Sequence, residues 1–296
     1  MALYFDMRCR DGREAVRISS LASLLAFAAL FGCDGDMPRV DDAGVFVPAR
    51  VTPRFEPSDG PMAFGAIAWP DDLYLDADGH PELSSLPSEE MALPAEFPDA
   101  MRATLSDLDG FSVGAPVFFY LQGEIDPASL PQSPSASTRE DSSVFLLDVD
   151  PASPTAFRRV PVSVSWNAGL RQLAMRPWDG HPLTPGRRYA AVLTDSVLDD
   201  LGDPIGPAPR FAAIRDAAMR PEGADAAAYD HYTPVLSSLA SNGIPRARVA
   251  GLAAFTVQTV APDMRDARAT VWARSPALTI DEMVAAGPAL DALLGE

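Results

Sequence analysis

This 296-residue sequence has little of several residue types on which protein chemistry often depends. It contains two cysteines, Cys9 and Cys33, three histidines (His80, His181 and His231) and no lysine, so that all 23 basic residues are arginine. Two cysteines exclude a disulfide framework and a structural zinc site built from thiolates. Three histidines that do not cluster in sequence leave little for metal or acid–base chemistry. We therefore expect no metal ion and no cofactor.

Positive charge is also scarce. The 41 acidic residues outnumber the basic ones and give a formal net charge of −18. Such a surface repels phosphate backbones, which argues against a nucleic-acid partner. The composition is 47% hydrophobic and 22% charged, which excludes a disordered tail and a multi-spanning membrane protein.

Long hydrophobic runs are absent as well. The apolar stretch at residues 18–31 has no charge over 14 residues, which is shorter than the roughly 20 that a membrane-spanning helix needs. A segment with four arginines, residues 8–17, precedes it. This order of a basic and then an apolar segment is typical of a secretory signal peptide, predicted at residues 1–32.

The apolar stretch ends in Leu30-Phe31-Gly32-Cys33, which resembles the lipobox of bacterial lipoproteins, although Phe31 stands where a small residue is usual. The resemblance implies that Cys33 is lipidated and becomes the first residue of the mature protein. It further implies an exported protein, anchored in a lipid membrane and facing the periplasm or the cell surface. The alternatives are an ordinary secretory signal with a chance cysteine, or a buried helix.

The rest of the chain divides into three regions. Residues 33–59 are rich in Pro and Asp and are predicted to be a flexible tether with one short strand at 45–47. Residues 60–215 are β-rich, and residues 216–296 form an α-rich segment with one strand. In the last segment we expect helices at residues 225–240, 262–274 and 279–294, and a strand at residues 249–260.

Apolar and polar residues alternate in the β-rich region. Val160, Val162, Val164 and Trp166 alternate with Pro and Ser, followed by a turn at residues 167–169 and a returning strand at 170–175. Several short strands at this spacing predict a mainly-β fold, an Ig-like β-sandwich with a helical C-terminal segment. The predicted sandwich core comprises Val162, Val164, Trp166, Leu173, Met175, Tyr189 and Leu193.

Two parts of the β-rich region resemble known bacterial families. Residues 183–193 and 197–202 are similar to the closing strands of bacterial Ig-like domains of surface-layer type. Residues 67–79 and 108–116 resemble the N-terminal region of large bacterial extracellular lipases.

Residues 232–239 and 254–259 fit the same lipase pattern, so that the resemblance covers roughly residues 55–270. In that family the region is a β-rich accessory part, and an α/β-hydrolase domain with its catalytic serine follows it. The resemblance therefore implies either a lipase N-terminal part without its hydrolase domain or a stand-alone accessory module.

Gly110-Phe-Ser-Val-Gly114 matches the G-x-S-x-G pattern of hydrolase nucleophiles. That pattern works when a strand precedes the serine and a helix follows it, so that the hydroxyl sits on a strained elbow. Here a strand is predicted after Ser112, and the motif reads as a loop entering the first strand. A triad of Ser112, Asp195 and His231 would have the chain order of a hydrolase, but we name no catalytic residue.

Two acidic turns and one loop aromatic complete the candidates. Residues 76–79 and 199–203 place aspartates near a glycine, which suggests either β-turns or weak calcium sites; the turns are preferred. Trp69, Trp166 and Trp272 are predicted core residues, whereas Trp178 lies in a Pro- and Gly-rich loop where it is free to contact a ligand. Each histidine is expected to serve in a turn or cap.

These features predict a membrane-anchored bacterial surface lipoprotein that acts as a non-catalytic interaction, spacer or accessory module, with its protein or lipid partner unspecified. The alternative is the N-terminal part of a secreted lipase or esterase whose hydrolase domain is absent from this chain. A third hypothesis is a hydrolase that acts through Ser112.

Overall fold

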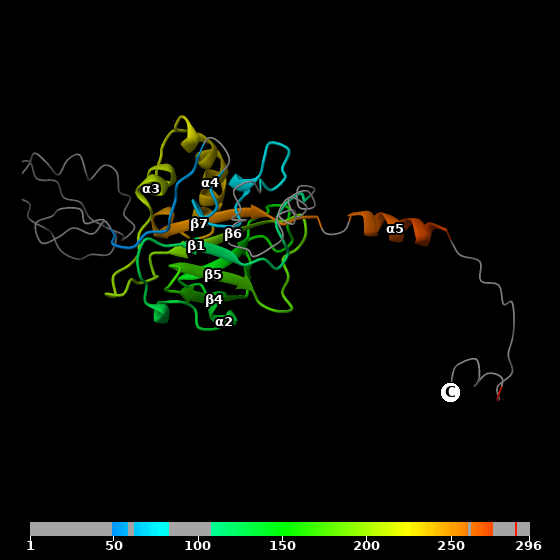
Figure 1. Cartoon of the computed structure of the whole chain (residues 1–296), viewed down its shortest axis with the longest axis horizontal. Helices are drawn as coiled ribbons and strands as arrows, with labels where there is room; N and C mark the ends of the chain where they lie inside the picture. The colour runs from blue at the N-terminus through cyan, green and yellow to red at the C-terminus, as the bar shows by residue number, and fades with distance from the viewer. Residues whose placement is uncertain (1–48, 59–61, 83–107, 260–261, 275–287, 289–296) are drawn as a thin grey trace, which may run out of the picture. The chain divides into compact units, whose positions relative to one another are not determined.

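The computed structural model describes residues 49–58, 62–82, 108–259, 262–274 and 288 (Figure 1). They belong to one compact unit that begins at Ala49. The predicted signal peptide, the lipidation site Cys33 and the strand at 45–47 lie outside the described residues. Of the helix predicted at 279–294, the description includes residue 288 alone.

Seven strands are formed within the described residues. They are β1 (Val117–Tyr120), β2 (Val144–Asp148), β3 (Arg159–Val160), β4 (Val162–Asn167), β5 (Gln172–Pro177), β6 (Arg188–Thr194) and β7 (Val249–Thr256). The α-helices are α2 (Pro134–Ser137), α3 (Pro209–Arg215), α4 (Ala224–Ser241) and α5 (Pro262–Ala273). Short 3₁₀ helices form at η1 (Asp72–Tyr74), η2 (Pro127–Ser129) and η3 (Arg246–Arg248).

The strands make two antiparallel sheets, as a mainly-β fold requires. One sheet has four strands in the order β3-β2-β6-β7, and the other has three in the order β1-β5-β4. All pairs in both sheets are antiparallel. β4 therefore lies at the edge of the smaller sheet, and β5 is the strand with which it pairs.

The chain changes sheet at Pro161, which corrects the prediction that Val160 continues the strand of Val162. Val160 lies in β3 and pairs with Leu146 of the larger sheet, whereas Val162 begins β4 and pairs with Pro177 of the smaller sheet. Proline has no backbone N–H, so a ladder is easily interrupted there. The alternation across residues 160–166 thus spans two strands.

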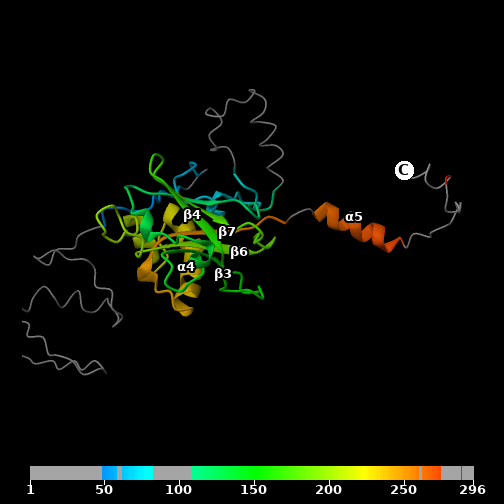
Figure 2. The same cartoon turned by 90° about the horizontal axis from the view of Figure 1, so that it is seen from below.

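The larger sheet is buried along almost its whole length. β2 is buried at every residue, and β6 and β7 at every residue but one. α4 contacts both β7 and α3, and the two helices lie together beside β7 (Figures 1 and 2). β2 contacts β4 of the other sheet. Because side chains on both faces are covered, these strands are apolar runs rather than alternating sequences.

α4 turns one apolar face towards this sheet. Ala228, Tyr232, Val235, Leu236 and Leu239 are all buried and recur at helical spacing. The helix matches the prediction at 225–240 within two residues. The strand expected at residues 249–260 is formed as β7, which ends at Thr256 and pairs with β6 of the larger sheet.

The predicted tether is too long at its C-terminal end. Val51 and Phe55 are 2% and 8% exposed and belong to the core. The backbone of this segment is also paired: Gln122 donates its N–H to the Thr52 carbonyl at 2.8 Å, and Arg54 donates to the Tyr120 carbonyl at 2.6 Å. Residues 49–58 are therefore part of the folded unit, because their apolar side chains pack against β1 and β7.

Most of the predicted core is confirmed. The fully buried members are Val162, Leu173, Met175, Tyr189 and Leu193. Val164 and Trp166 are only partly buried, since β4 has no neighbouring strand on its outer side. The returning strand is confirmed, but it begins two residues later than predicted, at Gln172.

The other tryptophans give mixed results. Trp69 packs against the core, with its ring 4.9 Å from that of Tyr74 and 5.3 Å from that of Phe111. Trp178 is 43% exposed, as predicted. The prediction for Trp272 is wrong: this residue of α5 is 69% exposed, and its ring contacts the guanidinium of Arg268 instead of the core.

Candidate functional site

A groove with a volume of about 440 Å³ lies between β4 and the segment that contains η2 and the start of α2. Its lining comes from Pro127, residues 130–134, residues 163–166 and Trp178, and we call it the β4 groove. Trp166 and Trp178 supply its aromatic surface. The volume falls within the range of small-ligand and peptide sites, about 300–1,000 Å³.

The backbone of β4 offers unpaired hydrogen-bonding groups to this groove. Trp178 donates its N–H to the Pro161 carbonyl at 2.9 Å, which fixes which residues bond to β5, because bonded and non-bonded pairs alternate in an antiparallel ladder. Val162, Val164 and Trp166 consequently turn their N–H and C=O groups away from β5. The N–H of Val162 is bonded to Ser137 Oγ at 3.0 Å, in agreement with this assignment.

The facing wall of the groove cannot close onto β4. Pro127, Pro131 and Pro134 line this wall, and proline has no N–H with which to extend a ladder. The wall therefore contacts β4 through Ser137 at its beginning, near Val162, and stands apart from Val164 and Trp166.

Side-chain hydrogen bonds hold the wall in place on the other side. Ser143 Oγ donates to the Ser129 carbonyl at 2.6 Å, and Leu198 donates its N–H to Ser129 Oγ at 3.0 Å. Asp126 caps η2 by accepting the N–H of Ala128 at 2.9 Å. Because the wall is fixed to residues of the larger sheet and its neighbouring loop, the groove is a preformed feature of the fold.

The lining of the β4 groove contains Pro, Leu, Gln, Ser, Val and Trp and no charged side chain. Acidic residues directly adjoin it in the chain: Asp126 precedes Pro127, and Asp179 follows Trp178. Asp179 lies 3.5 Å from Arg176, and both side chains are more than half exposed. The groove is thus an uncharged surface within a strongly acidic protein.

A second polar feature lies inside the molecule, around Asp71. This side chain is fully buried and accepts hydrogen bonds from three different segments. Tyr232 of α4 donates its hydroxyl at 2.9 Å, Ala254 of β7 its N–H at 2.9 Å, and Leu73 its N–H at 3.0 Å. Burial and the Asp71 carboxylate raise the pKa of Tyr232, so its hydroxyl stays protonated and donates.

Asp72, Arg188 and His231 extend this cluster. Asp72 accepts the N–H and the hydroxyl of Thr256 at 2.6 and 2.9 Å, and it lies 3.6 Å from Arg188 Nε. Arg188 donates to His231 Nδ1 at 2.9 Å. Since a guanidinium only donates, Nδ1 must accept, which assigns the imidazole proton to Nε2. That nitrogen is 3.0 Å from Asp71 Oδ1, at ion-pair distance but not aligned for a hydrogen bond.

We call the cluster of Asp71, Asp72, Arg188, His231 and Tyr232 the lock, because its hydrogen bonds and charges join separate segments of the chain. It joins η1, β6, α4 and β7, and none of its members lines the β4 groove. Burial raises the pKa of Asp72, whereas the N–H of Thr256 opposes that rise. Ion pairs of this kind impose a large penalty when one partner is removed, which makes them effective in fixing one arrangement of segments.

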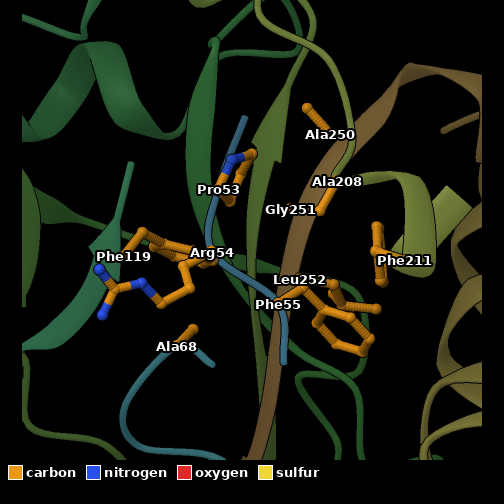
Figure 3. A pocket seen from close by; sticks show the side chains of 10 residues that line it. All are labelled: Pro53, Arg54, Phe55, Ala68, Phe119, Ala208, Phe211, Ala250, Gly251 and Leu252. Carbon is orange, nitrogen blue, oxygen red and sulfur yellow. The ribbon is translucent and has the colours of Figure 1, made fainter. Parts of the chain in front are cut away.

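A small crevice beside the lock is filled by the protein itself. Figure 3 shows Pro53 and Phe55 of the N-terminal segment over Gly251 and Leu252 of β7, with Phe211 of α3 alongside. The space left between them is about 10 Å³, roughly the room for one water molecule. A Cβ on Gly251 would lie 2.9 Å from Pro53 Cγ, so the close approach of this segment requires glycine.

Ser112 is not placed as a nucleophile. It lies in an exposed loop that leads into β1, with the N–H of Gly114 3.4 Å from its Oγ. Asp195 and His231, which would complete a hydrolase triad with Ser112, have other partners. His231 lies 3.0 Å from Asp71, and Asp195 forms an ion pair with Arg248 at 3.2 Å. The interpretation of the motif as a loop before the first strand is confirmed.

Both acidic turns are confirmed as turns. Asp76 Oδ1 accepts the N–H groups of Asp78 and His80 at 2.9 Å each, and Gly79 adopts a φ of +88°. Asp199 Oδ1 accepts in the same way from Leu201 and Asp203. The hydrogen bond from the His80 N–H lowers the pKa of Asp76. Among the described residues, no three His, Cys, Asp or Glu side chains form a group suited to a metal ion.

The roles expected of the histidines are partly wrong. His80 does follow a turn, and its Nδ1 lies 2.9 Å from the Leu108 carbonyl. His181 is exposed in a loop. His231 is neither a turn nor a cap residue but lies within α4 and joins the lock. Sequence reasoning missed this because 160 residues separate Asp71 from His231, although the Asp71-Asp72 pair is conspicuous in the sequence.

Within the part of the chain that the structure describes, no helix is both long and apolar enough to cross a membrane. No protein-family model and no curated protein matches the chain.

Two solved structures show a low similarity to it, the surface layer protein SbsC, domains 1–6, and the S-layer protein rSbsC(31-844). Each has a TM-score of 0.22 and 12% sequence identity over 32% of this chain, and the match spans 11% of the other chain. A TM-score this low leaves the function to be argued from the residues of the chain itself.

Proposed function

We propose that this chain is an exported, membrane-anchored bacterial surface lipoprotein that acts as a non-catalytic binding module through the β4 groove. The observation that carries the proposal is the groove itself. Two tryptophans and the unpaired edge of a strand face a space of about 440 Å³. Exposed aromatic side chains beside unpaired backbone groups are common features of sites that bind other molecules.

We include in this proposal that the two sheets are the layers of an Ig-like sandwich. The contact between β2 and β4, which belong to different sheets, supports this. Such an architecture holds the β4 groove on a rigid support, which is what an accessory module of the kind found in bacterial extracellular lipases needs.

The membrane anchor rests on Cys33 and the apolar stretch before it. A single acyl chain binds membranes only marginally, so firm anchoring requires the multiple acylation typical of lipoprotein cysteines. Cys33→Ser is expected to release the chain from the membrane fraction of a bacterial host. Equal fractionation of variant and wild type would show that Cys33 is not the anchor.

The binding role is tested by site-specific photo-cross-linking in intact cells. A benzoylphenylalanine placed at Trp178 is expected to give a discrete adduct upon irradiation. The matched control is the same substitution at Met219, an exposed apolar residue outside the groove lining. If the two positions give the same products, or if neither gives one, the β4 groove is not a binding surface.

The hydrolase hypothesis predicts turnover of a short-chain p-nitrophenyl ester that disappears in Ser112→Ala. We expect no turnover by either protein, because an acyl-transfer site needs a base within reach of its nucleophile. Activity that depends on Ser112 in a folded protein would overturn the non-catalytic assignment.

A further inference from the structure

We propose that the β4 groove binds an extended polypeptide segment, which adds to the free edge of β4 as a further strand. The inference rests on the binding role proposed above and identifies the chemistry of the ligand. Its centre consists of alternating apolar and hydroxyl-bearing side chains, and its flanks are basic.

The unpaired backbone of β4 is the first argument. The register turns the N–H and C=O groups of Val164 and Trp166 into the groove, two residues apart. None of these groups has a hydrogen-bonding partner within the described part of the chain. An extended peptide presents donors and acceptors at the same spacing, and main-chain bonding of this kind is the basis of binding by strand addition.

The opposite wall is the second argument, because it selects a single strand. Its prolines cannot pair with β4, and they leave an open space between the two walls. A lone extended segment fits between the walls, whereas the edge of a folded sheet carries further strands and side chains behind it. A second copy of this chain is further disfavoured by its own net charge of −18.

The two faces of β4 define the side chains of the ligand. Val164 and Trp166 pair with Met175 and Leu173 and lie on the apolar face. Ser163 and Ser165 lie on the other face. Successive side chains of an added strand also point to opposite faces, so apolar residues meet Trp166, and hydroxyl-bearing residues meet the serines.

The distribution of charge around the groove indicates where the ligand is uncharged and where it is basic. The lining has no charged side chain, so a charge at the centre of the ligand would lose water without finding a partner. Asp126 adjoins the lining, and the net charge of −18 favours basic flanks.

The probe is the peptide acetyl-Lys-(Thr-Val)₃-Thr-Lys-amide, with a fluorophore on one lysine. Fluorescence anisotropy with the full chain purified in detergent is expected to show saturable binding. The matched control ligand has the same side chains but is N-methylated at its five central residues, which removes donors from both edges. Loss of two or more backbone hydrogen bonds should weaken its binding about tenfold or more. Equal affinity of the two peptides would overturn strand addition.

Variants of the protein test the same backbone hydrogen bonds by changing β4 instead of the peptide. Val164→Pro removes an N–H that faces the groove and leaves the hydrogen bonds to β5 in place. The variant should therefore bind the peptide about threefold to tenfold more weakly. Trp178→Ala should weaken peptide binding by a similar factor, whereas Met219→Ala should leave binding unchanged. The two peptides compared on the wild-type protein keep the test valid if Val164→Pro does not fold.

Three outcomes overturn the inference. One is the absence of saturable peptide binding up to the solubility limit. Another is saturable binding of a β-1,4-linked N-acetylglucosamine tetramer that Trp178→Ala abolishes, while the same substitution leaves binding of the peptide unchanged. The third is a dimer in sedimentation velocity that Val164→Pro dissociates, which would identify a second copy as the occupant. If the adduct at position 178 forms in cells while the peptide fails to bind, the binding role stands and the choice of ligand is wrong.

Discussion

The two sheets of this molecule solve the problem of the exposed strand edge differently. In the larger sheet, β2 and β6 are interior strands, β3 at one edge is only two residues long, and β7 at the other edge is covered by α4 and by the N-terminal segment around Pro53. In the smaller sheet, the edge strand β4 faces a groove whose wall stands apart from it. An uncovered edge is a liability that folded proteins usually avoid. The binding role that we propose for β4 rests on this difference.

Polar residues follow the same division. Asp71, Asp72 and Arg188 are engaged inside the molecule and hold segments together around β7. The polar groups of the β4 groove are uncharged and accessible. Buried charges that are well satisfied specify one packing arrangement, whereas neutral groups at an open edge are suited to exchange water for a ligand.

The largest effect is expected from removing the centre of the lock. Asp71→Ala leaves the Tyr232 hydroxyl, the Ala254 N–H and His231 without their buried partner. Each buried donor left without its acceptor costs about 1–3 kcal/mol, so we expect a total loss of about 3–5 kcal/mol. The free energy of unfolding from urea titration measures it.

Asp230→Ala is the control for Asp71→Ala, because Asp230 lies on α4 next to His231 but is paired with Arg220 at the surface. The control should be close to wild type. If both substitutions had the same small effect, the lock would contribute nothing to the larger sheet.

A core substitution in each sheet comes next. Leu146 of β2 is fully buried, and Leu146→Ala should cost about 3–4 kcal/mol of unfolding free energy. Trp166 has the larger side chain but is only partly buried, so Trp166→Ala should cost about 2 kcal/mol, less than for a fully buried tryptophan. A greater loss at Trp166 than at Leu146 would mean that the edge of the smaller sheet is as closely packed as the interior of the larger one.

Asp72 gives a pH-dependent test of the lock. Its pKa in the folded protein is raised by burial, so the native state holds a proton more firmly than the unfolded state does. Stability from this group is therefore lost as the pH rises from the ordinary aspartate pKa of 3.8 through the raised pKa. Asp72→Asn removes this loss. The unfolding free energy of the variant relative to wild type should increase across that window, and a constant difference would contradict the raised pKa.

Much of the fold could be predicted from the sequence, because local patterns determine it. The alternation around Val162 and the Ala-rich spacing around Tyr232 gave a strand and a helix that the structure contains. The change of sheet at Pro161 was missed because the alternation continues through it. Trp272 was misassigned because an aromatic residue at helical spacing looks the same whether or not a partner covers it.

The candidate site was predictable only in part. Trp178 stood out as a loop aromatic, and it lines the β4 groove. The groove itself depends on which strand lies at an edge, and strand order is not encoded locally. The lock was invisible for the same reason, since Asp71, Arg188 and His231 meet only once the sheet and α4 are in place.

The smallest effect on stability is expected at Trp178, and it is the sharpest test of the division between the sheets. Trp178 follows β5, and its side chain is 43% exposed. Trp178→Ala should change the free energy of unfolding by less than about 1 kcal/mol, as for other surface positions. The same variant should bind the peptide about threefold to tenfold more weakly, because the Trp178 side chain lines the groove. Urea titration and anisotropy on one protein preparation measure both. A stability loss as large as that of Trp166→Ala would make Trp178 a packing residue of the smaller sheet, and its conspicuous position would then have no functional meaning.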